Sequence, residues 1–295
     1  MDQAEQLRNI IKAGNVKRSR PLARVITVTS GKGGVGKSNT AINLAIQFRK
    51  MGKKVVILDA DFGLANIEIM FGAVPKHNLS DLIYQGKNIK DIITWGPMEV
   101  GFISGGSGIT GLSNLSKDYL TYIVHNLAEL DTIADVIIVD TGAGISDAVL
   151  EFLVASGEIL LVTTPEPTSI TDSYSLLKAL NGHPGLERDN TQICMIANRV
   201  STANEGEVLF QKLDVVVSRY LKLPITYLGA VPQDPLLPKA VMQQLPVSLQ
   251  NPQARSAQAY EEIAAKLMKQ DEGQNTQKRG VAAFFSHIIG KRNNG

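Results

Sequence analysis

The sequence predicts an α/β protein with a doubly wound, mainly parallel sheet flanked by helices. From residue 24 to about residue 270, short β-branched runs alternate with longer stretches in which apolar residues recur every three or four positions. The short runs are continuously apolar, which is typical of strands buried on both faces of a sheet. The expected strands are Val25–Thr29, Val55–Leu58, Val136–Val139, Ile159–Thr163, Ile193–Ala197 and Thr226–Ala230, and the clearest expected helices are Ser38–Met51 and Asp118–Leu130.

The composition allows one large core and gives little indication of partners. Of the 295 residues, 44% are hydrophobic and 20% are charged, which suffices for a single α/β domain with short tails. The 30 Lys and Arg nearly balance the 28 Asp and Glu, so we expect no nucleic-acid partner. The single cysteine, Cys194, excludes an intramolecular disulfide and, without a C-x-x-C pair, argues against an iron–sulfur site.

The pattern divides the chain into three regions. Residues 1–23 form a short amphipathic segment and a basic linker, residues 24–270 form the α/β domain, and residues 271–295 form a polar linker and a final apolar segment. The N-terminus lacks the apolar core of roughly 7–15 residues that a secretory signal needs. No run approaches the roughly 18 apolar residues of a spanning helix. We therefore expect a cytoplasmic protein whose contact with a membrane is peripheral.

A phosphate-binding loop follows the first expected strand and opens a helix. The loop reads Gly31, Lys32, Gly33, Gly34, Val35, Gly36, Lys37 and Ser38, with Asn39 next, and satisfies G-x-x-x-x-G-K-[ST]. Its glycines let several backbone N–H groups face one anion, and the helix N-terminus adds its dipole. Lys37 reaches the β- and γ-phosphates, and the Ser38 hydroxyl is offered to Mg²⁺. The sequence therefore predicts a nucleotide site.

Carboxylates follow two of the other expected strands. Asp59 and Asp61 are spaced i, i+2 after Val55–Leu58, so their side chains point the same way. Asp140 ends the apolar run Val136–Val139, as in a Walker B segment that holds Mg²⁺ through its water shell. Because ligands bind at the carboxyl ends of parallel strands, we expect these groups beside the phosphates. A cap of the following segment is an alternative role for Asp59.

The loop sequence GKGGVGKS, with Lys32 at its second position, resembles the deviant-Walker-A MinD/ParA family. The resemblance implies an ATPase that forms a homodimer with ATP bound, in which Lys32 crosses the interface to the partner's phosphates. It also implies catalytic roles for Lys32, Lys37 and Asp61, the last positioning the attacking water, and support of the Mg²⁺ shell by Asp59. Asn198 and Pro232 fall where the family recognises adenine. Alternatively, Lys32 is a solvated loop lysine and Asn198 ends its strand.

The N-terminal residues resemble the DQAxxLR motif of the FlhG (YlxH/FleN) family of flagellar MinD-like ATPases. The matching residues are Asp2, Gln3, Ala4, Leu7 and Arg8. The resemblance implies that this segment binds the GTPase FlhF and stimulates GTP hydrolysis, with Gln3 placed to orient water. It also implies binding to flagellar basal-body proteins and control of flagellar number and placement.

The last apolar segment carries a stripe on one helical face, flanked by basic residues. The stripe consists of Val281, Phe284, Phe285, Ile288 and Ile289. A short apolar helix with flanking cations suits the surface of an anionic membrane and resembles the membrane-targeting helix of MinD-type proteins. Permanent packing on its own domain is the alternative, and a helix that docks and is then released contains both possibilities.

Three other functions remain open beside a flagellar regulator. A MinD-type regulator of the division site shares the loop and the tail. A ParA-like DNA-partitioning ATPase needs a basic surface and no terminal apolar helix, and a biosynthetic enzyme of this fold needs a further substrate site. We expect slow, regulatory ATP hydrolysis with ATP and Mg²⁺ as ligands, located in the cytoplasm and reversibly on the inner face of the cell membrane.

Overall fold

A computed structural model describes residues 22–61, 66–105, 117–273 and 280–291. Within these ranges, the backbone alone is described for residues 117–122, 271–273 and 289–291. The strands are β1 (Arg24–Thr29), β2 (Val55–Ala60), β3 (Thr94–Trp95), β4 (Gly101–Ser104), β5 (Val136–Thr141), β6 (Glu158–Thr163), β7 (Gln192–Val200) and β8 (Thr226–Pro232). Each of the six expected strands is present and extends by one to three residues beyond its predicted bounds at its start, its end or both.

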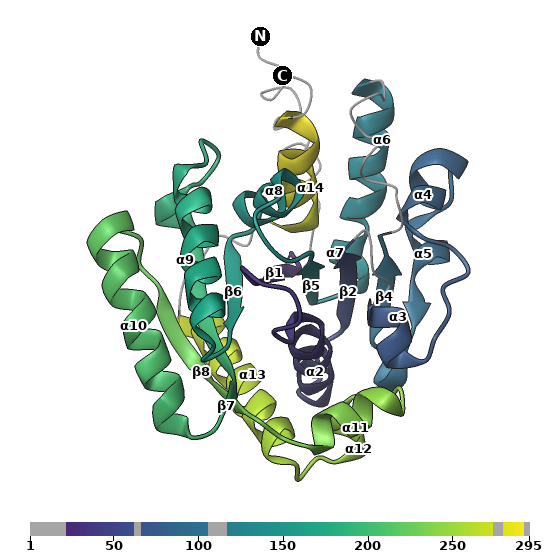
Figure 1. The fold of residues 1–295 in the computed structure, drawn as a ribbon. Coiled ribbons are helices and arrows are strands. Elements are labelled where there is room, and N and C mark those ends of the chain that lie inside the picture. Colours follow the sequence, from purple (N-terminus) through teal and green to yellow (C-terminus); the bar gives the residue numbers. More distant parts are fainter. Residues whose placement is uncertain (1–21, 62–65, 106–116, 274–279, 292–295) are drawn as a thin grey trace.

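Helices connect the strands and cover both faces of the sheet (Figure 1). They are α2 (Lys37–Lys50), α3 (Asn66–Phe71), α4 (Leu79–Gln85), α5 (Ile89–Ile92), α6 (Lys117–Ala128), α7 (Leu130–Ile133), α8 (Asp147–Ala155), α9 (Pro167–Gly182), α10 (Ala203–Leu221), α11 (Leu236–Met242), α12 (Val247–Gln250), α13 (Arg255–Gly273) and α14 (Gly280–Lys291). The helix expected at Asp118–Leu130 ends instead at Ala128, and a separate short helix, α7, follows it.

The described strands form one eight-stranded sheet in the order β3-β4-β2-β5-β1-β6-β7-β8. All neighbours are parallel except β3 and β4, which confirms the doubly wound, mainly parallel fold. The register places Asp59 of β2 directly beside Asp140 of β5, and Val28 of β1 on the other side of Asp140. The expected carboxylates therefore end adjacent strands at one edge of the sheet.

The sequence pattern missed β3 and β4, and the reason lies in tertiary packing. β4 has four residues and starts at Gly101. A Cβ at Gly101 would lie 3.0 Å from a methyl of Ile93 and 3.1 Å from one of Val56. The strand is thus defined by its close approach to β2 and to the segment before β3, and four residues with a glycine at the start carry no clear strand signal.

Three apolar clusters hold the helices on the sheet. On one face, strand residues such as Ile26 and Ile57 pack with α2, α3 and α11 to α13. On the opposite face, Val56 and Ile137 pack with α4 to α8 and α14, and farther along this face Leu161 packs with α8 to α10. Because successive residues of each strand point to opposite faces, both faces are covered, and the continuous apolarity of the strands follows.

α14 lies on the domain between α6 and α8 (Figure 1). Its residues Val281, Phe284, Phe285 and Ile288 are between 0% and 3% exposed. The Phe284 ring lies 6.0 Å from that of Phe152 in α8, and it meets Phe285 edge-on at 5.2 Å. Four of the five residues of the expected membrane stripe are therefore buried against their own chain in this conformation; the side chain of the fifth, Ile289, lies outside the described residues.

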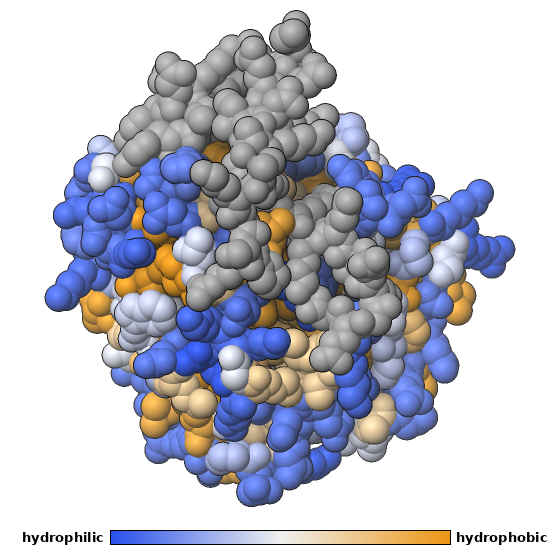
Figure 2. All heavy atoms as spheres, turned by 180° about the vertical axis from the view of Figure 1, so that it is seen from behind, coloured by the Kyte–Doolittle hydropathy of each residue, from blue (hydrophilic) through white to orange (hydrophobic). Residues whose placement is uncertain are grey.

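The surface of the described residues is mainly hydrophilic on the face opposite to that of Figure 1. Figure 2 shows the rear face, where hydrophilic residues predominate and apolar ones form small groups between them. Within the described ranges, no helix is both long enough and apolar enough to cross a bilayer.

Candidate functional site

The phosphate-binding loop lies between β1 and α2 and is shaped by positive backbone angles and close contacts. Gly34 and Gly36 have φ values of 75° and 100°, which a side chain at these positions would disfavour. A Cβ at Gly31 would lie 2.2 Å from the backbone carbonyl carbon of Asp172 in α9, so only glycine fits. The loop therefore rests directly on the start of α9. Lys37 is the first residue of α2, and it is buried.

The loop that follows β5 is tied to the phosphate-binding loop. The Gly144 N–H donates to the Ser30 carbonyl at 3.0 Å, and the Thr141 hydroxyl donates to the Val28 carbonyl at 3.1 Å. Gly142 lies near the Asp61 carboxylate, since a Cβ there would be 3.6 Å from Asp61 Oδ1. These contacts bring Asp61, Gly142 and Gly144 to the same edge as the phosphate-binding loop.

Asp59 and Asp140 form a buried acidic pair beside Ser38 and Lys37. Burial and, after it, the charge of Asp140 raise the pKa of the Asp59 carboxyl to about 7. Burial raises the pKa of Asp140 to about 6, and the nearby Ser38 hydroxyl and Lys37 amine oppose that shift. Neither carboxyl oxygen of Asp140 has a hydrogen-bond partner among the described residues, although both are buried. Buried, unpaired carboxylate oxygens beside a serine hydroxyl fit a hard divalent cation such as Mg²⁺.

Asp59 also orders the segment in which Asp61 lies. Its Oδ1 accepts from the Asp61 N–H at 3.1 Å, and its Oδ2 accepts from the Ile67 N–H at 3.4 Å. Asn66 donates its side-chain amide to Asp61 Oδ2 at 3.4 Å. The alternative role for Asp59, a cap of the following segment, is thus present together with its place in the acidic pair. Residues 62–65, which follow Asp61, lie outside the described residues.

Lys32 is held within its own chain. Its Nζ donates to Glu166 Oε2 and to Thr168 Oγ1, both at 2.9 Å, and these acceptors belong to the β6–α9 connection and the start of α9. The proximity of Lys32 lowers the pKa of the Glu166 carboxyl. The sequence did not identify Glu166, Thr168 or Asn66, although their positions after strand ends at the ligand edge were the available signal.

Asn198 lies in β7 against the phosphate-binding loop. Its amide nitrogen donates to the Val35 carbonyl at 2.6 Å, and a Cβ at Gly36 would lie 2.3 Å from the same nitrogen. Asn198 therefore supports the loop, and its contact with adenine stays a prediction. Pro232 ends β8 beside Val200, at the same edge of the sheet, and its role with adenine also stays a prediction. The expected partner-binding residues, 2–8, lie outside the described residues.

Comparison with known proteins finds a matching family and similar proteins over most of the chain. A model of the ParA family, described as NUBPL iron-transfer P-loop NTPase, matches residues 21–268. The chain is 38% identical over 244 residues to the antiactivator FleN of Pseudomonas aeruginosa, covering 83% of this chain and 86% of FleN. It is 32% identical over 295 residues to the flagellum site-determining protein YlxH of Helicobacter pylori, covering 98% of each.

A solved structure shares the fold. The septum site-determining protein MinD of Pyrococcus horikoshii, complexed with Mg-ADP, superposes with a TM-score of 0.66 at 22% identity and covers 85% of this chain and 98% of that one.

The only cysteine of the chain, Cys194, is buried in β7, where burial raises the pKa of its thiol to about 12. One inert thiol offers no paired ligands for iron. With this loop, this acidic pair and these relatives, the chain belongs to the ParA family of P-loop NTPases and is a MinD-like ATPase that uses ATP and Mg²⁺.

Proposed function

We propose that the chain is an ATP-switched regulator of flagellar number and placement that dimerises with ATP and associates reversibly with the membrane. The names of FleN and YlxH support the flagellar role over division-site selection or DNA partitioning. The observation that carries the switch is the burial of the α14 stripe. Val281, Phe284, Phe285 and Ile288 cannot touch lipid while they pack on α6 and α8, so membrane binding requires a change of state.

The acidic pair and the loop divide the work of hydrolysis. Bound Mg²⁺ supplies positive charge to the phosphates. Ser38, Asp59 and Asp140 would hold the ion and its water shell, Lys37 would bind the β- and γ-phosphates, and Asp61 would orient the attacking water. Catalysis by these residues rests on positioning and electrostatics. The proposal includes slow turnover that serves as a timer.

In this proposal, dimerisation changes the partner of the Lys32 amine. In the present conformation its amine is paired with Glu166 and Thr168 of its own chain. With ATP bound, the γ-phosphate of a partner subunit is a stronger and less solvated anion than an exposed carboxylate, and Lys32 moves across the interface to it. The ATP-bound dimer is therefore stabilised by two such contacts, and hydrolysis removes them.

Dimerisation also explains how a short helix can hold a membrane. One amphipathic helix binds lipid weakly and reversibly, whereas two in one dimer act together through a high effective concentration. We place the dimer on the inner face of the cell membrane through α14 and anionic lipids. The ATP-free monomer returns to the cytoplasm with α14 docked.

The proposal assigns the N-terminal segment to partner activation. Residues 2–8 stimulate the GTPase FlhF, and further contacts reach basal-body proteins of the flagellum. Its support is the motif at Asp2, Gln3, Ala4, Leu7 and Arg8 together with a relation to YlxH that spans nearly the whole chain.

Vesicle co-sedimentation with light scattering tests the switch. The full chain is measured with ADP and with ATP, alongside Lys32→Gln and, as a matched control, Lys212→Gln on the exposed face of α10. We expect ATP to produce a dimer that sediments with anionic vesicles, Lys32→Gln to lose both properties, and Lys212→Gln to keep both. A wild-type protein that stays monomeric and free of lipid with ATP contradicts the proposal.

The activation of FlhF is tested separately. A peptide of residues 1–23 added to purified FlhF should raise its GTPase rate, and the same peptide with Gln3→Ala should not. Equal stimulation by both peptides contradicts the role of Gln3, and no stimulation by either contradicts the role of the segment.

A further inference from the structure

The carboxylate of Asp131 lies where both tails join the domain. Asp131 belongs to α7 and is 6% exposed. Its Oδ1 accepts from the Ala23 N–H at 3.2 Å and from the Val281 N–H at 3.1 Å. Ala23 precedes β1 and leads into the N-terminal segment, and Val281 is the second residue of α14. One oxygen atom therefore fastens two ends of the chain that are far apart in sequence.

Asp131 supplies what α14 lacks. The first turn of α14 contains no acidic residue, and a helix N-terminus carries unpaired N–H groups and a positive partial charge. A carboxylate from outside the helix pairs one of these groups and opposes that charge. Hydrogen bonds to charged groups are among the stronger ones in proteins, so this contact contributes to keeping α14 docked.

The junction is closely packed around the carboxylate. Gly280, at the start of α14, has a φ of 64°. A Cβ at Gly280 would lie 3.1 Å from both methyl groups of Leu22 and 3.2 Å from Asp131 Oδ2. Val281 is fully buried and Ala23 is 1% exposed. The start of α14 and the end of the N-terminal segment thus shield each other, and the shared carboxylate, from water.

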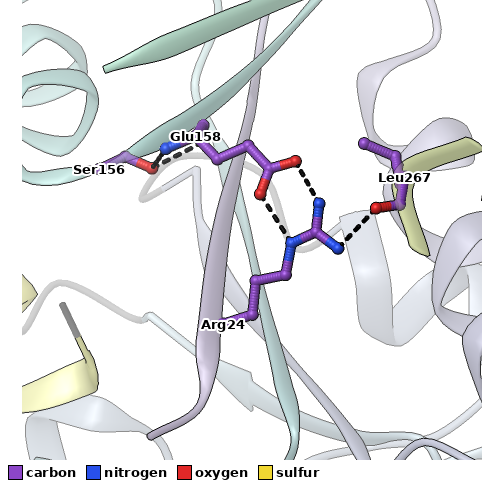
Figure 3. A network of polar contacts seen from close by, with 4 residues as sticks. All are labelled: Arg24, Ser156, Glu158 and Leu267. Atoms are coloured by element: carbon purple, nitrogen blue, oxygen red, sulfur yellow. Dashed lines mark hydrogen bonds and ion pairs between the residues drawn. The ribbon is translucent and has the colours of Figure 1, made fainter. Parts of the chain in front are cut away.

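Arg24, the first residue of β1, has anchors that do not involve α14. The Arg24 N–H donates to the Asp135 carbonyl at 2.9 Å. Figure 3 shows the Arg24 guanidinium paired with both oxygens of Glu158, at 2.8 and 2.6 Å, and bonded to the Leu267 carbonyl of α13 at 2.9 Å. Any loosening at the junction therefore stops at Arg24 and affects the residues before it.

We propose that Asp131 is a positioning residue that couples the two tails. When α14 leaves its groove, water reaches the carboxylate, and the hydrogen bond to Ala23 loses the burial that made it strong. The attachment of the N-terminal segment then loosens. By linkage, a partner that pulls Ala23 away from Asp131 weakens the docking of α14 by the same factor by which undocking of α14 weakens the attachment of Ala23. This coupling between Ala23 and α14 exists in the conformation in which α14 is docked. Its role in linking membrane binding to partner activation rests on the proposed function.

Amide hydrogen exchange followed by NMR on the full chain, without nucleotide or lipid, tests the coupling. Phe284→Asp places a charge in the apolar cluster and forces α14 out while Asp131 remains intact. We expect exchange at Ala23 to rise by about tenfold or more together with exchange along α14, while Arg24 and β5 keep their wild-type rates. If α14 exchanges faster and Ala23 does not, the coupling is refuted.

Variants of the anchor complete the test. Asp131→Ala should accelerate both Ala23 and Val281, whereas Asp131→Asn, which keeps an acceptor oxygen, should restore most of the protection. Asp135→Ala is the matched control, because its carboxylate accepts from the Lys54 N–H at 2.7 Å and makes no hydrogen bond to the described residues of either tail. Wild-type exchange at Val281 in Asp131→Ala overturns the anchor role. Addition of anionic vesicles and ATP is a separate arm: absence of lipid binding there counts against the proposed function and leaves the exchange result standing.

Discussion

The nucleotide edge of the sheet and the groove that holds α14 belong to one domain but are built by opposite means. At the nucleotide edge, glycines and charged groups crowd together, and the buried Asp140 oxygens have no hydrogen-bond partner among the described residues. In the groove, aromatic rings and aliphatic side chains fill the space, and α14 completes the cluster. The nucleotide edge has buried charge that a bound ligand can neutralise, whereas the groove is already filled by α14 of the same chain. Ligand binding should therefore stabilise the nucleotide edge most. The apolar contacts of the groove must be broken if α14 is to bind elsewhere.

The largest expected effect concerns the groove. Phe284→Ala removes a fully buried ring and should lower the free energy of unfolding by about 3–5 kcal/mol if α14 stays docked. Undocking of α14 sets an upper limit to this loss, so Phe284→Ala and Phe285→Ala should be less than additive. Urea denaturation measures both. Ser286→Ala, on the same helix, is the control, because the buried Ser286 hydroxyl has no hydrogen-bond partner within the described part of the chain and its removal should not destabilise. Wild-type stability in Phe284→Ala contradicts a docked α14 in solution.

The nucleotide edge should respond most to a change at Gly31. A Cβ there meets the backbone of Asp172 at 2.2 Å, so Gly31→Ala must displace α9 or the loop, at a cost of about 1–3 kcal/mol. Gly33→Ala is the matched control, because the nearest atom to its Cβ is 4.0 Å away. Thermal denaturation without nucleotide separates the two, and nucleotide titration should show a weakened site in Gly31→Ala. Equal stability of the two variants contradicts the close approach of loop and helix.

These two regions also differ in how far the sequence predicts them. The loop, Asp59 and Asp140 were predicted because each follows an apolar run within a few residues, and parallel strands bring such ends together. The stripe of α14 was equally visible, but whether it meets lipid or its own domain depends on Phe152 and α6, which are distant in sequence. The cis partners of Lys32 and the contact of Asn198 with Val35 were missed for the same reason. Short motifs specify chemistry, whereas tertiary packing decides which partner a side chain meets.

The acidic pair gives the nucleotide edge a pH dependence. The pKa values of Asp59 and Asp140 are raised to about 7 and about 6, from an ordinary value of 3.8. At pH values between the ordinary pKa and the raised pKa, these carboxyls are ionised in the unfolded chain but protonated in the folded chain. The free energy of unfolding without ligand should therefore fall as pH rises from about 4 to about 7. The slope is at most about 1.4 kcal/mol per pH unit for each group. Above both folded values the stabilisation from protonation is gone.

Mg²⁺ with nucleotide should reverse this dependence, because the cation favours the ionised carboxylates and displaces their protons. Calorimetric titration at pH 6 in two buffers of different ionisation enthalpy measures the protons released. We expect release in the wild type and less in Asp59→Asn. Asp214→Asn, at a half-buried acid of α10 outside the acidic pair, is the control and should match the wild type. Binding without proton release at pH 6 contradicts the raised pKa values.

The smallest effect sharpens the comparison at the rim of the nucleotide edge, where Lys32 is exposed to solvent and paired with Glu166. Glu166→Gln removes the charge that competes with a partner's phosphates but leaves Thr168 as an acceptor. Because exposed ion pairs are weak, we expect ATP-dependent dimerisation to tighten only about twofold to fivefold, with most of the gain at low salt. Analytical ultracentrifugation over a salt series measures it, with Glu187→Gln as a control at an exposed acid near the far end of α9. Weaker dimerisation in Glu166→Gln would mean that Glu166 holds Lys32 in the closed dimer as well as in the resting monomer, and this would contradict the proposed transfer of Lys32 to the partner's phosphates.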